Sequence, residues 1–381
     1  MLTILSSWVE ISKSAFDHNI RTYRSIINPD KKLGIIIKSN AYGHDTVTIA
    51  RLCQEHQYVD WICPNSLSEA LSIRNVGITK PILVICNIDD NPALAIVNKI
   101  DLIGYSIDQI KKLNEIGNQK NQPVYIHLKV DTGMGRLGFL PEELFSALEQ
   151  IMHLPYIRIR GLFSHFAKSS AANLNYTHYQ VKRFKTIVQK LKQRKIEIPL
   201  RHLANSAAIP LISLEEANMV RLGTGAFGLY PSHANTILTK NQHPSFSLKP
   251  ILTWKTHILH IKKVPSNSFI GYGRSYKTNR NTTIGFLPLG FYEGLNIQLS
   301  NKGVVLLSRQ QKYAPIIGRI CMNITMIDLT DIDTVAQGDE VTLIANKPQI
   351  NPEAIEHLIN TGNLREITSR IIASIPRFIV S

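Results

Sequence analysis

The sequence predicts a TIM-like (β/α)8 barrel followed by a mainly β domain, and three observations support this prediction. Short apolar runs alternate with helical segments through residues 33–222. The runs are apolar without interruption, as parallel strands covered on both faces require. Eight such units match the size and alternation of a closed barrel, and the lack of a central break favours closure over an open doubly wound sheet.

The expected barrel strands follow one another at short intervals. They are the runs 33–37, 61–63, 82–85, 102–105, 124–130, 157–163, 201–203 and 219–222. Helix starts are expected between them, and two carry local signals. Ser66 and Glu69 form a capping box, and Pro141 is expected in the first turn of a helix.

The texture of the sequence changes near residue 240, so we expect one domain over residues 1–240 and a second over residues 241–381. A linker is expected at 243–250, and the early run 8–11 is expected to be a strand of either domain. The runs expected as strands of the second domain are 251–261, 304–307, 316–321, 326–329 and 341–344, and long helical patterns are nearly absent until 352–358.

The composition is that of an ordinary globular protein. Apolar residues make up 44% and charged residues 19% of the 381 residues, which excludes a wholly disordered or collagen-like chain. No apolar run is long enough to span a bilayer, and the first residues lack the pattern of a signal peptide. The four cysteines form no C-x-x-C pair. We therefore expect a cytoplasmic protein with no membrane partner and no metal site.

The formal net charge of +15 would attract anions, nucleic acids included. The densest basic stretch is 182–195. Its apolar residues Phe184, Ile187, Val188 and Leu191 recur at helical spacing, so its cations are expected to cover the solvent face of a helix. Because no recognised nucleic-acid module accompanies the charge, no nucleic-acid partner is predicted.

Polar residues gather where the barrel strands are expected to end, which is the face where barrel active sites form. They are Lys38, Lys129, Arg136, His165, Asn205, Ser206, Arg221, Gly223 and Thr224. A lysine at the barrel mouth can form a Schiff base. Small and polar residues after the last two strands can offer N–H and O–H groups to a phosphate. A lysine beside a phosphate pocket suggests pyridoxal 5′-phosphate as the cofactor.

A competing motif lies at residues 133–138, which fit the G-x-G-x-x-G pattern of dinucleotide-binding proteins. The motif falls in the fifth unit of the barrel, however. No acidic residue stands about 20 positions further on, where the ribose contact would be. A dehydrogenase is therefore the weaker interpretation.

Six motifs resemble those of bacterial alanine racemase, occur in the same order and extend over nearly the whole chain. They are Lys38-Ser-Asn-Ala-Tyr-Gly-His44, Lys129-Val-Asp-Thr-Gly-Met-Gly-Arg136, His165-Phe-Ala, Asn205-Ser206-Ala-Ala, Gly271-Tyr272-Gly-Arg274 and Gly318-Arg-Ile-Cys-Met322. The resemblance implies a barrel that binds pyridoxal phosphate and a homodimer whose two active sites each include residues of the partner subunit. It also implies interconversion of L- and D-alanine, which supplies D-alanine for peptidoglycan.

The resemblance assigns a role to each matching residue. Lys38 resembles the lysine that binds the cofactor and acts as one acid/base group, and Tyr272, from the partner subunit, resembles the other. Met322, also from the partner, resembles the residue whose backbone N–H receives the substrate carboxylate. The cofactor contacts implied are Tyr42, Ser206, Gly223 and Thr224 at the phosphate and Arg136 and Arg221 at the ring. Asn205 and His165 are also expected to bind the cofactor.

Chemistry explains several of these residue types. Racemisation removes a proton from one face and returns one to the other, so two opposed bases suit it. His165 and Arg221 resemble a hydrogen-bonded relay that assists the tyrosine. Arg221 can only donate a hydrogen bond to the pyridine nitrogen, so it leaves that nitrogen unprotonated and suppresses transamination. Arg136 resembles the arginine that meets the ring hydroxyl and the substrate, and Lys129 the lysine that is carbamylated to hold it.

Three departures from the family's pattern concern substrate choice. Asn323 replaces an aspartate, Phe291 replaces an entrance tyrosine, and Arg365 stands where a tyrosine lines the phosphate and substrate pocket. A serine or broad-specificity racemase is therefore an alternative function. A non-catalytic barrel protein that carries pyridoxal phosphate is a further alternative, but Tyr272 and the second domain argue against it.

Overall fold

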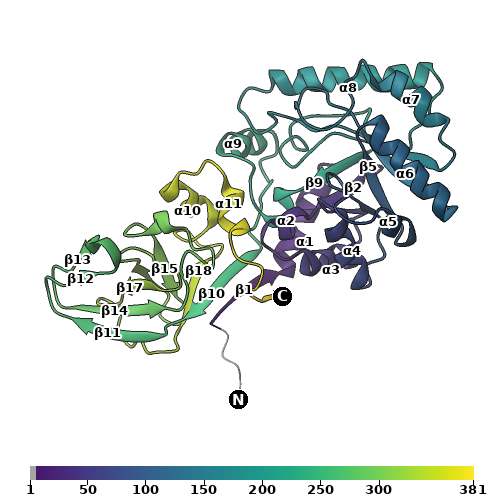
Figure 1. Ribbon diagram of the computed structural model, residues 1–381. Coiled ribbons are helices and arrows are strands. Elements are labelled where there is room, and N and C mark those ends of the chain that lie inside the picture. The colour runs from purple at the N-terminus through teal and green to yellow at the C-terminus, as the bar shows by residue number, and fades with distance from the viewer. Residues whose placement is uncertain (1–5) are drawn as a thin grey trace.

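Strands β2 to β9 close into a parallel barrel, and the predicted fold class is confirmed. The computed structural model describes residues 6–381 (Figure 1). Each strand pairs with the next, and the last pairs with the first through Leu33 and Val220. The strands are β2 (Lys32–Ile36), β3 (Trp61–Cys63), β4 (Ile82–Leu83), β5 (Ile100–Gly104), β6 (Val124–Lys129), β7 (Ile157–Phe163), β8 (Leu200–His202) and β9 (Met219–Leu222).

Helices surround the barrel (Figure 1). They are α1 (Lys13–Arg24), α2 (Lys38–Tyr42), α3 (Thr46–Glu55), α4 (Leu67–Asn75), α5 (Ala93–Val97), α6 (Ile107–Lys120), α7 (Leu144–Met152), α8 (Asn175–Gln193), the short η1 (Thr224–Phe227) and α9 (His233–Gln242). The basic stretch lies on α8, which buries the expected apolar residues Phe184, Ile187, Val188 and Leu191. None of the helices within residues 6–381 has both the length and the apolar character needed to cross a bilayer.

The helix start predicted at Ser66 is confirmed without the full capping box, and the one predicted at Pro141 is wrong. Ser66 caps α4 by accepting from the backbone N–H of Glu69, but the Glu69 side chain does not reach back to Ser66. It accepts instead from the backbone N–H groups of Asn65 and Ser39, each at 2.7 Å. Pro141 lies before its helix, because Glu143 donates to the carbonyl of Leu140 in a turn and α7 begins only afterwards.

The second part of the chain holds three sheets and two helices. A six-stranded sheet has the order β16-β15-β18-β10-β1-β19, beside a sheet β11-β14-β17 and a hairpin β12-β13. The strands are β1 (Ser7–Ser12), β10 (Leu252–His257), β11 (His260–Val264), β12 (Phe269–Ile270), β13 (Tyr276–Lys277), β14 (Thr282–Leu287), β15 (Val304–Leu307), β16 (Lys312–Pro315), β17 (Thr325–Asp328), β18 (Glu340–Ile344) and β19 (Arg377–Val380). The helices are α10 (Pro352–Ile359) and α11 (Leu364–Ser369), with short turns η2 (Tyr272–Arg274) and η3 (Ile297–Leu299).

The early strand β1 pairs antiparallel with β10 and parallel with β19, so it belongs to the six-stranded sheet rather than to the barrel. Figure 1 shows it running beside β10 and leading into α1. The predicted domain boundary near residue 240 stays a prediction, and α9 runs across that position.

Two of the strands expected in this part were wrong. The run 251–261 divides into β10 and β11, because the chain leaves β18 and joins β14 at residues 258 and 259. The run 316–321 is not a strand, since Gly318 has a φ of +74° and turns the chain. Its apolar residues Ile316, Ile317 and Ile320 are buried, which explains why the run resembles a strand in the sequence.

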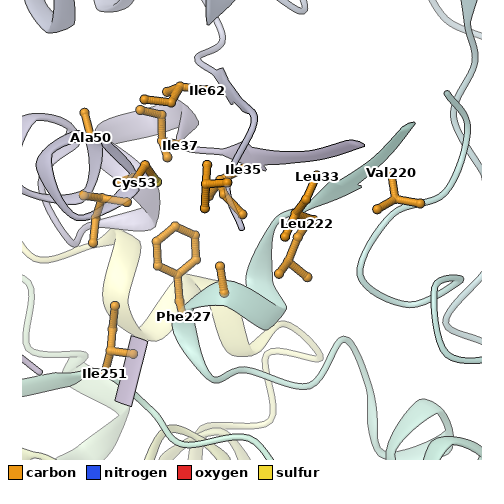
Figure 2. Packing of buried hydrophobic residues seen from close by; sticks show 14 of the residues in the cluster. Leu33, Ile35, Ile37, Ala50, Cys53, Ile62, Val220, Leu222, Phe227 and Ile251 are labelled. Carbon is orange, nitrogen blue, oxygen red and sulfur yellow. The ribbon is translucent and has the colours of Figure 1, made fainter. Parts of the chain in front are cut away.

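Apolar packing extends from the barrel to its C-terminal face. Figure 2 shows the ring of Phe227 directed toward Ile37 and Cys53, with Ile251 on its other side. Phe227 is fully buried and also stacks on the ring of His44, with ring centroids 4.6 Å apart. Burying such a side chain stabilises the fold by about 1.5–3 kcal/mol. The turn after β2 and the turn after β9 are therefore held against each other.

Helix α11 packs directly on the turn that follows β2, and Gly43 makes this contact possible. Gly43 has a φ of +90°, and a Cβ there would lie 2.0 Å from the carbonyl oxygen of Thr368 in α11. Gly77 has a similar φ of +85° but no heavy atom within 4 Å of such a Cβ. Comparing substitutions at Gly43 and Gly77 therefore distinguishes the cost of backbone strain from the cost of a steric clash.

We expect Gly43→Ala to lower the free energy of unfolding by about 3 kcal/mol or more, because both backbone strain and a steric clash oppose the new methyl group. Gly77→Ala should cost only about 1–2 kcal/mol, the price of a left-handed alanine. Denaturant unfolding of both variants measures the difference. Equal losses would mean that α11 does not press on Gly43.

Candidate active site

A cavity of about 520 Å³ opens at the carboxyl ends of the barrel strands. Its lining includes all the barrel residues predicted from the sequence, namely Lys38, Tyr42, Lys129, Arg136, His165, Asn205, Ser206, Arg221, Gly223 and Thr224. Arg365, from α11, also lines it. Of the described residues around the cavity, none is Asp or Glu. The cavity is therefore cationic and suits an anionic ligand.

Lys38 begins a left-handed turn, which is rare for residues other than glycine. Ser39, Asn40, Ala41 and Tyr42 have φ values of 55°, 52°, 49° and 57°. Each such residue costs about 1–2 kcal/mol, so surrounding contacts must hold the turn in place. Glu69 provides one of these contacts by accepting from the backbone N–H of Ser39 at 2.7 Å. Strain of this kind is typical of functional sites.

Both lysines of the cavity have a lowered pKa. Burial is the main cause for Lys38, and the charges of Arg136 and Arg365 add to it. Burial, followed by the charges of Arg221 and Arg136, lowers the pKa of Lys129 to about 7. The ammonium group of Lys129 lies 4.5 Å from the centre of the Phe163 ring. Near neutral pH a part of the Lys129 amine is therefore uncharged, and for both lysines the neutral, nucleophilic form is favoured relative to an exposed lysine.

A cradle for an oxyanion is formed by the turns after β8 and β9. The Ser206 hydroxyl accepts from the backbone N–H groups of Gly223 and Gly225 at 2.9 and 3.3 Å. A Cβ on Gly223 would lie 3.0 Å from the hydroxyl of Tyr42, so glycine lets that hydroxyl approach. Burial raises the pKa of Tyr42 to about 12, so its phenol keeps its proton. The cradle joins O–H and N–H groups within a small space, as phosphate sites require.

The loop after β6 carries Arg136 and contains the G-x-G-x-x-G sequence. Asp131 organises it by accepting from the backbone N–H groups of Gly133, Met134 and Arg136 at 2.6–2.9 Å. These hydrogen bonds lower the pKa of Asp131 against the effect of its burial. Arg136 is exposed at the rim of the cavity. The glycines therefore serve a turn held by a carboxylate, and not a strand-to-helix dinucleotide site.

Arg221 lies buried at the base of the cavity, inside a network that sequence reasoning missed. It donates to the carbonyl oxygen of Ser164 at 2.7 Å and to Nδ1 of His202 at 2.5 Å. Burial lowers the pKa of Arg221 to about 10, so it stays protonated near neutral pH. Within residues 6–381 no hydrogen bond joins the ring of His165 to Arg221. Burial and the charge of Arg221 hold the pKa of His165 well below its usual range.

The His202 ring is hydrogen-bonded to His127, which in turn is hydrogen-bonded to Asp101, and both residues are buried in the barrel. The signal for this network is present in the sequence, because each residue interrupts or borders an expected apolar strand. The sequence alone does not show that strands β5, β6 and β8 bring the three side chains together.

Tyr272 and Met322 are not part of this chain's cavity. They are 71% and 56% exposed, and Tyr272 lies between β12 and β13, which Figure 1 places at the end of the molecule far from α2. Phe291, Tyr292 and Phe269 are exposed on the same part of the chain. Their contribution to a partner's active site stays a prediction.

The departures noted in the sequence lie in different places. Asn323 donates to Glu293 at 2.7 Å near the exposed Phe291, whereas Arg365 reaches the cavity. The guanidinium of Arg365 donates to the side chain of Asn363 at 2.7 Å. Of the three, Arg365 is the residue whose position bears on what this chain's own cavity can bind.

Models of known families match both parts of the chain. The alanine racemase N-terminal domain matches residues 11–231, and the alanine racemase C-terminal domain matches residues 251–379. Alanine racemase 2 of Caldanaerobacter subterraneus subsp. tengcongensis is 36% identical over 342 residues, which cover 89% of this chain and 85% of that protein.

Solved structures of racemases superpose on this chain. The alanine racemase of Clostridium difficile 630 superposes with a TM-score of 0.91 and 31% identity, covering 99% of this chain and 96% of that one. A histidine racemase of Leuconostoc mesenteroides also superposes, with a TM-score of 0.89 and 25% identity over 99% of this chain and 98% of that one. With family models matched along nearly the whole sequence, the chain belongs to the alanine racemase family.

Proposed function

We propose that the protein is a racemase that interconverts L- and D-alanine with pyridoxal 5′-phosphate. The observation that carries the proposal is the cavity, where a half-buried lysine with a lowered pKa and an oxyanion cradle face a buried arginine. Family membership supports the same reaction. A role in supplying D-alanine for peptidoglycan, in the cytoplasm, follows from that function.

The residues of the cavity fit pyridoxal phosphate. Lys38 would hold the cofactor covalently, while Ser206, Gly223 and Tyr42 would take the phosphate at their O–H and N–H groups. Arg221, which can only donate, would meet the pyridine nitrogen. When bound, the cofactor withdraws electrons from the substrate's Cα–H bond and so makes that proton removable.

The protein's own groups then move the proton. Burial and neighbouring cations lower the pKa of Lys38, which favours the neutral amine that a base requires. Lys38 serves one face of the substrate. The opposite face needs a second group, and the family resemblance assigns that role to Tyr272 of a partner subunit. We therefore propose a homodimer with shared active sites.

Arg365 is the main argument for the alternative, a serine or broad-specificity racemase, because a flexible cation widens a pocket that a rigid ring would narrow. A carrier of pyridoxal phosphate without turnover is the third candidate. An assay of D-amino-acid formation from a panel of L-amino acids, including alanine, serine and histidine, separates them. Alanine should react fastest, and no product from any amino acid would favour the carrier.

Replacing Arg365 with tyrosine should lower the rate with serine relative to alanine by about 10-fold, because a ring would exclude the added hydroxyl. Competing reactions with both amino acids measure the ratio of kcat/KM values. Arg365→Lys keeps the charge without a ring and should leave the ratio near its original value. An unchanged ratio in Arg365→Tyr would mean that this position does not control substrate width.

Lys129 should carry a carbamate formed with carbon dioxide. The reaction needs the neutral amine, whose pKa is lowered to about 7 mainly by burial. The modified fraction should therefore rise from about pH 6 to about pH 8 and fall as protonation returns the charge. The new carboxylate would face Arg136 and Arg221, which favour its negative charge.

Carbon NMR with isotope-labelled bicarbonate measures the carbamate. Lys129→Met is the control and should show no signal at any pH. A signal that persists in this variant, or one absent from the unmodified protein throughout the pH range, would contradict the assignment.

A further inference from the structure

A buried chain of hydrogen bonds runs through the barrel from Asp101 to Arg221. Arg221 Nη1 lies 2.5 Å from His202 Nδ1, and His202 Nε2 lies 2.9 Å from His127 Nδ1. His127 Nε2 then lies 3.2 Å from Oδ2 of Asp101. The other carboxylate oxygen of Asp101 accepts from Arg160 at 2.7 Å. Asp101, both histidines and Arg221 are buried.

The groups at the two ends of this hydrogen-bond chain determine which atom donates and which accepts in every hydrogen bond between them. A guanidinium can only donate and an ionised carboxylate can only accept. His202 must therefore accept at Nδ1 and donate from Nε2, and His127 must accept at Nδ1 and donate from Nε2. Burial lowers the pKa of both rings, which agrees with neutral imidazoles, each with a single N–H.

The strands around this hydrogen-bond chain depart from ordinary barrel packing to accommodate its side chains. A Cβ on Gly161 of β7 would lie 2.1 Å from His127 Nδ1, so the neighbouring strand gives up its side chain where the ring passes. The pairing of β6 with β7 is irregular between Ile126 and His127. His202 stacks on Phe163, with an interplanar angle of 5°. A barrel interior filled by apolar side chains would need none of these features.

We propose that Asp101, acting through His127 and His202, is a positioning residue that holds Arg221 in place at the base of the cavity. The carboxylate fixes the tautomer of the first ring, which fixes that of the second. The second ring then presents a bare nitrogen to Arg221. This arrangement keeps a buried guanidinium aimed at one point without placing a carboxylate beside the ligand. The proposal rests on the proposed function only for its kinetic test.

Removing the carboxylate of Asp101, the final acceptor, tests this hydrogen-bond chain. In Asp101→Leu the N–H of His127 has no partner, so His127 and His202 lose their fixed orientation. In Asp101→Asn one carbonyl oxygen can still accept from His127, since Arg160 is partly exposed and can turn to solvent. Asp60→Leu is the matched control. Asp60 accepts from the backbone of Leu33 and from Lys32 at the same end of the barrel, and it shares no hydrogen bond with Asp101, His127, His202 or Arg221.

Two readouts are taken on the holoenzyme. NMR of nitrogen-labelled histidine, assigned with single substitutions, should show both rings protonated at Nε2, a state kept in Asp101→Asn and in Asp60→Leu and lost in Asp101→Leu. Asp101→Leu should lower kcat for racemisation by about 10–100-fold, the cost of a supporting group misplaced by about 1 Å. The ratio of transamination, measured as pyruvate released from alanine, to racemisation should rise, because a loosened Arg221 lets the pyridine nitrogen take a proton.

Three outcomes would decide between this proposal and its alternatives. A ring protonated at Nδ1 in the unmodified protein would overturn the direction of the chain. Equal loss in Asp101→Leu and Asp60→Leu with an unchanged ratio would overturn the positioning role. If the protein racemises nothing, the proposed function fails, and the NMR tautomers in the three variants still decide whether Asp101 orients the chain.

Discussion

Replacing Lys38 with alanine should abolish racemisation, lowering it by at least about 10³-fold, because the variant loses both the covalent hold on the cofactor and one of the two bases. No other lysine replaces it, since Lys129 lies at the end of a different strand. In the unmodified protein, borohydride should fix the cofactor on Lys38. Peptide mapping by mass spectrometry identifies the modified residue, and a cofactor fixed on a different lysine would contradict the assignment.

The same variant tests the shared site. Lys38→Ala and Tyr272→Phe should each be inactive alone, since each lacks one base. In mixed dimers one of the two sites receives the intact Lys38 of one subunit and the intact Tyr272 of the other. Partial activity should therefore return after subunit exchange. If exchange is demonstrated and no activity returns, Tyr272 does not serve the partner's cavity.

The barrel was predictable from the sequence because each of its strands must be apolar on both faces. That requirement leaves uninterrupted runs such as 33–37 and 157–163, and both are strands in the structure within one residue at each end. Residues at the ends of these runs face one cavity because parallel strands in a closed barrel end on the same side. Lys38, Arg221 and Ser206 could be placed together on this ground alone.

The rest depended on contacts between distant segments. The buried run 316–321 has the composition of a strand, but its turn at Gly318 is set by packing against other parts of the chain. The chain from Asp101 to Arg221 needs the register of several strands, and single polar residues in apolar runs do not reveal which of them meet. Arg365 likewise lines the cavity because α11 packs beside α2, although the two helices are far apart in the sequence.

Tyr272 is exposed and lies outside the cavity of its own chain. A phenol 71% exposed on its own chain has no catalytic surroundings there, so any role in proton transfer requires a partner's cavity. Tyr272→Phe removes one hydroxyl and leaves Lys38, the phosphate cradle and Arg221 unchanged. The variant therefore tests one face of the reaction and leaves the other intact.

In Tyr272→Phe, racemisation should fall by about 10²–10⁴-fold, the usual contribution of a positioned acid/base group. Exchange of the α-proton with deuterated solvent should survive for the enantiomer whose proton faces Lys38, which the family resemblance assigns to D-alanine. The same exchange should nearly vanish for L-alanine, because its proton faces the lost hydroxyl. Proton NMR of each enantiomer in deuterium oxide measures both rates, with Tyr292→Phe as the control for another exposed tyrosine of the same region. Equal loss for both enantiomers, with the cofactor still bound, would mean that Tyr272 positions the substrate and that a different group is the second base.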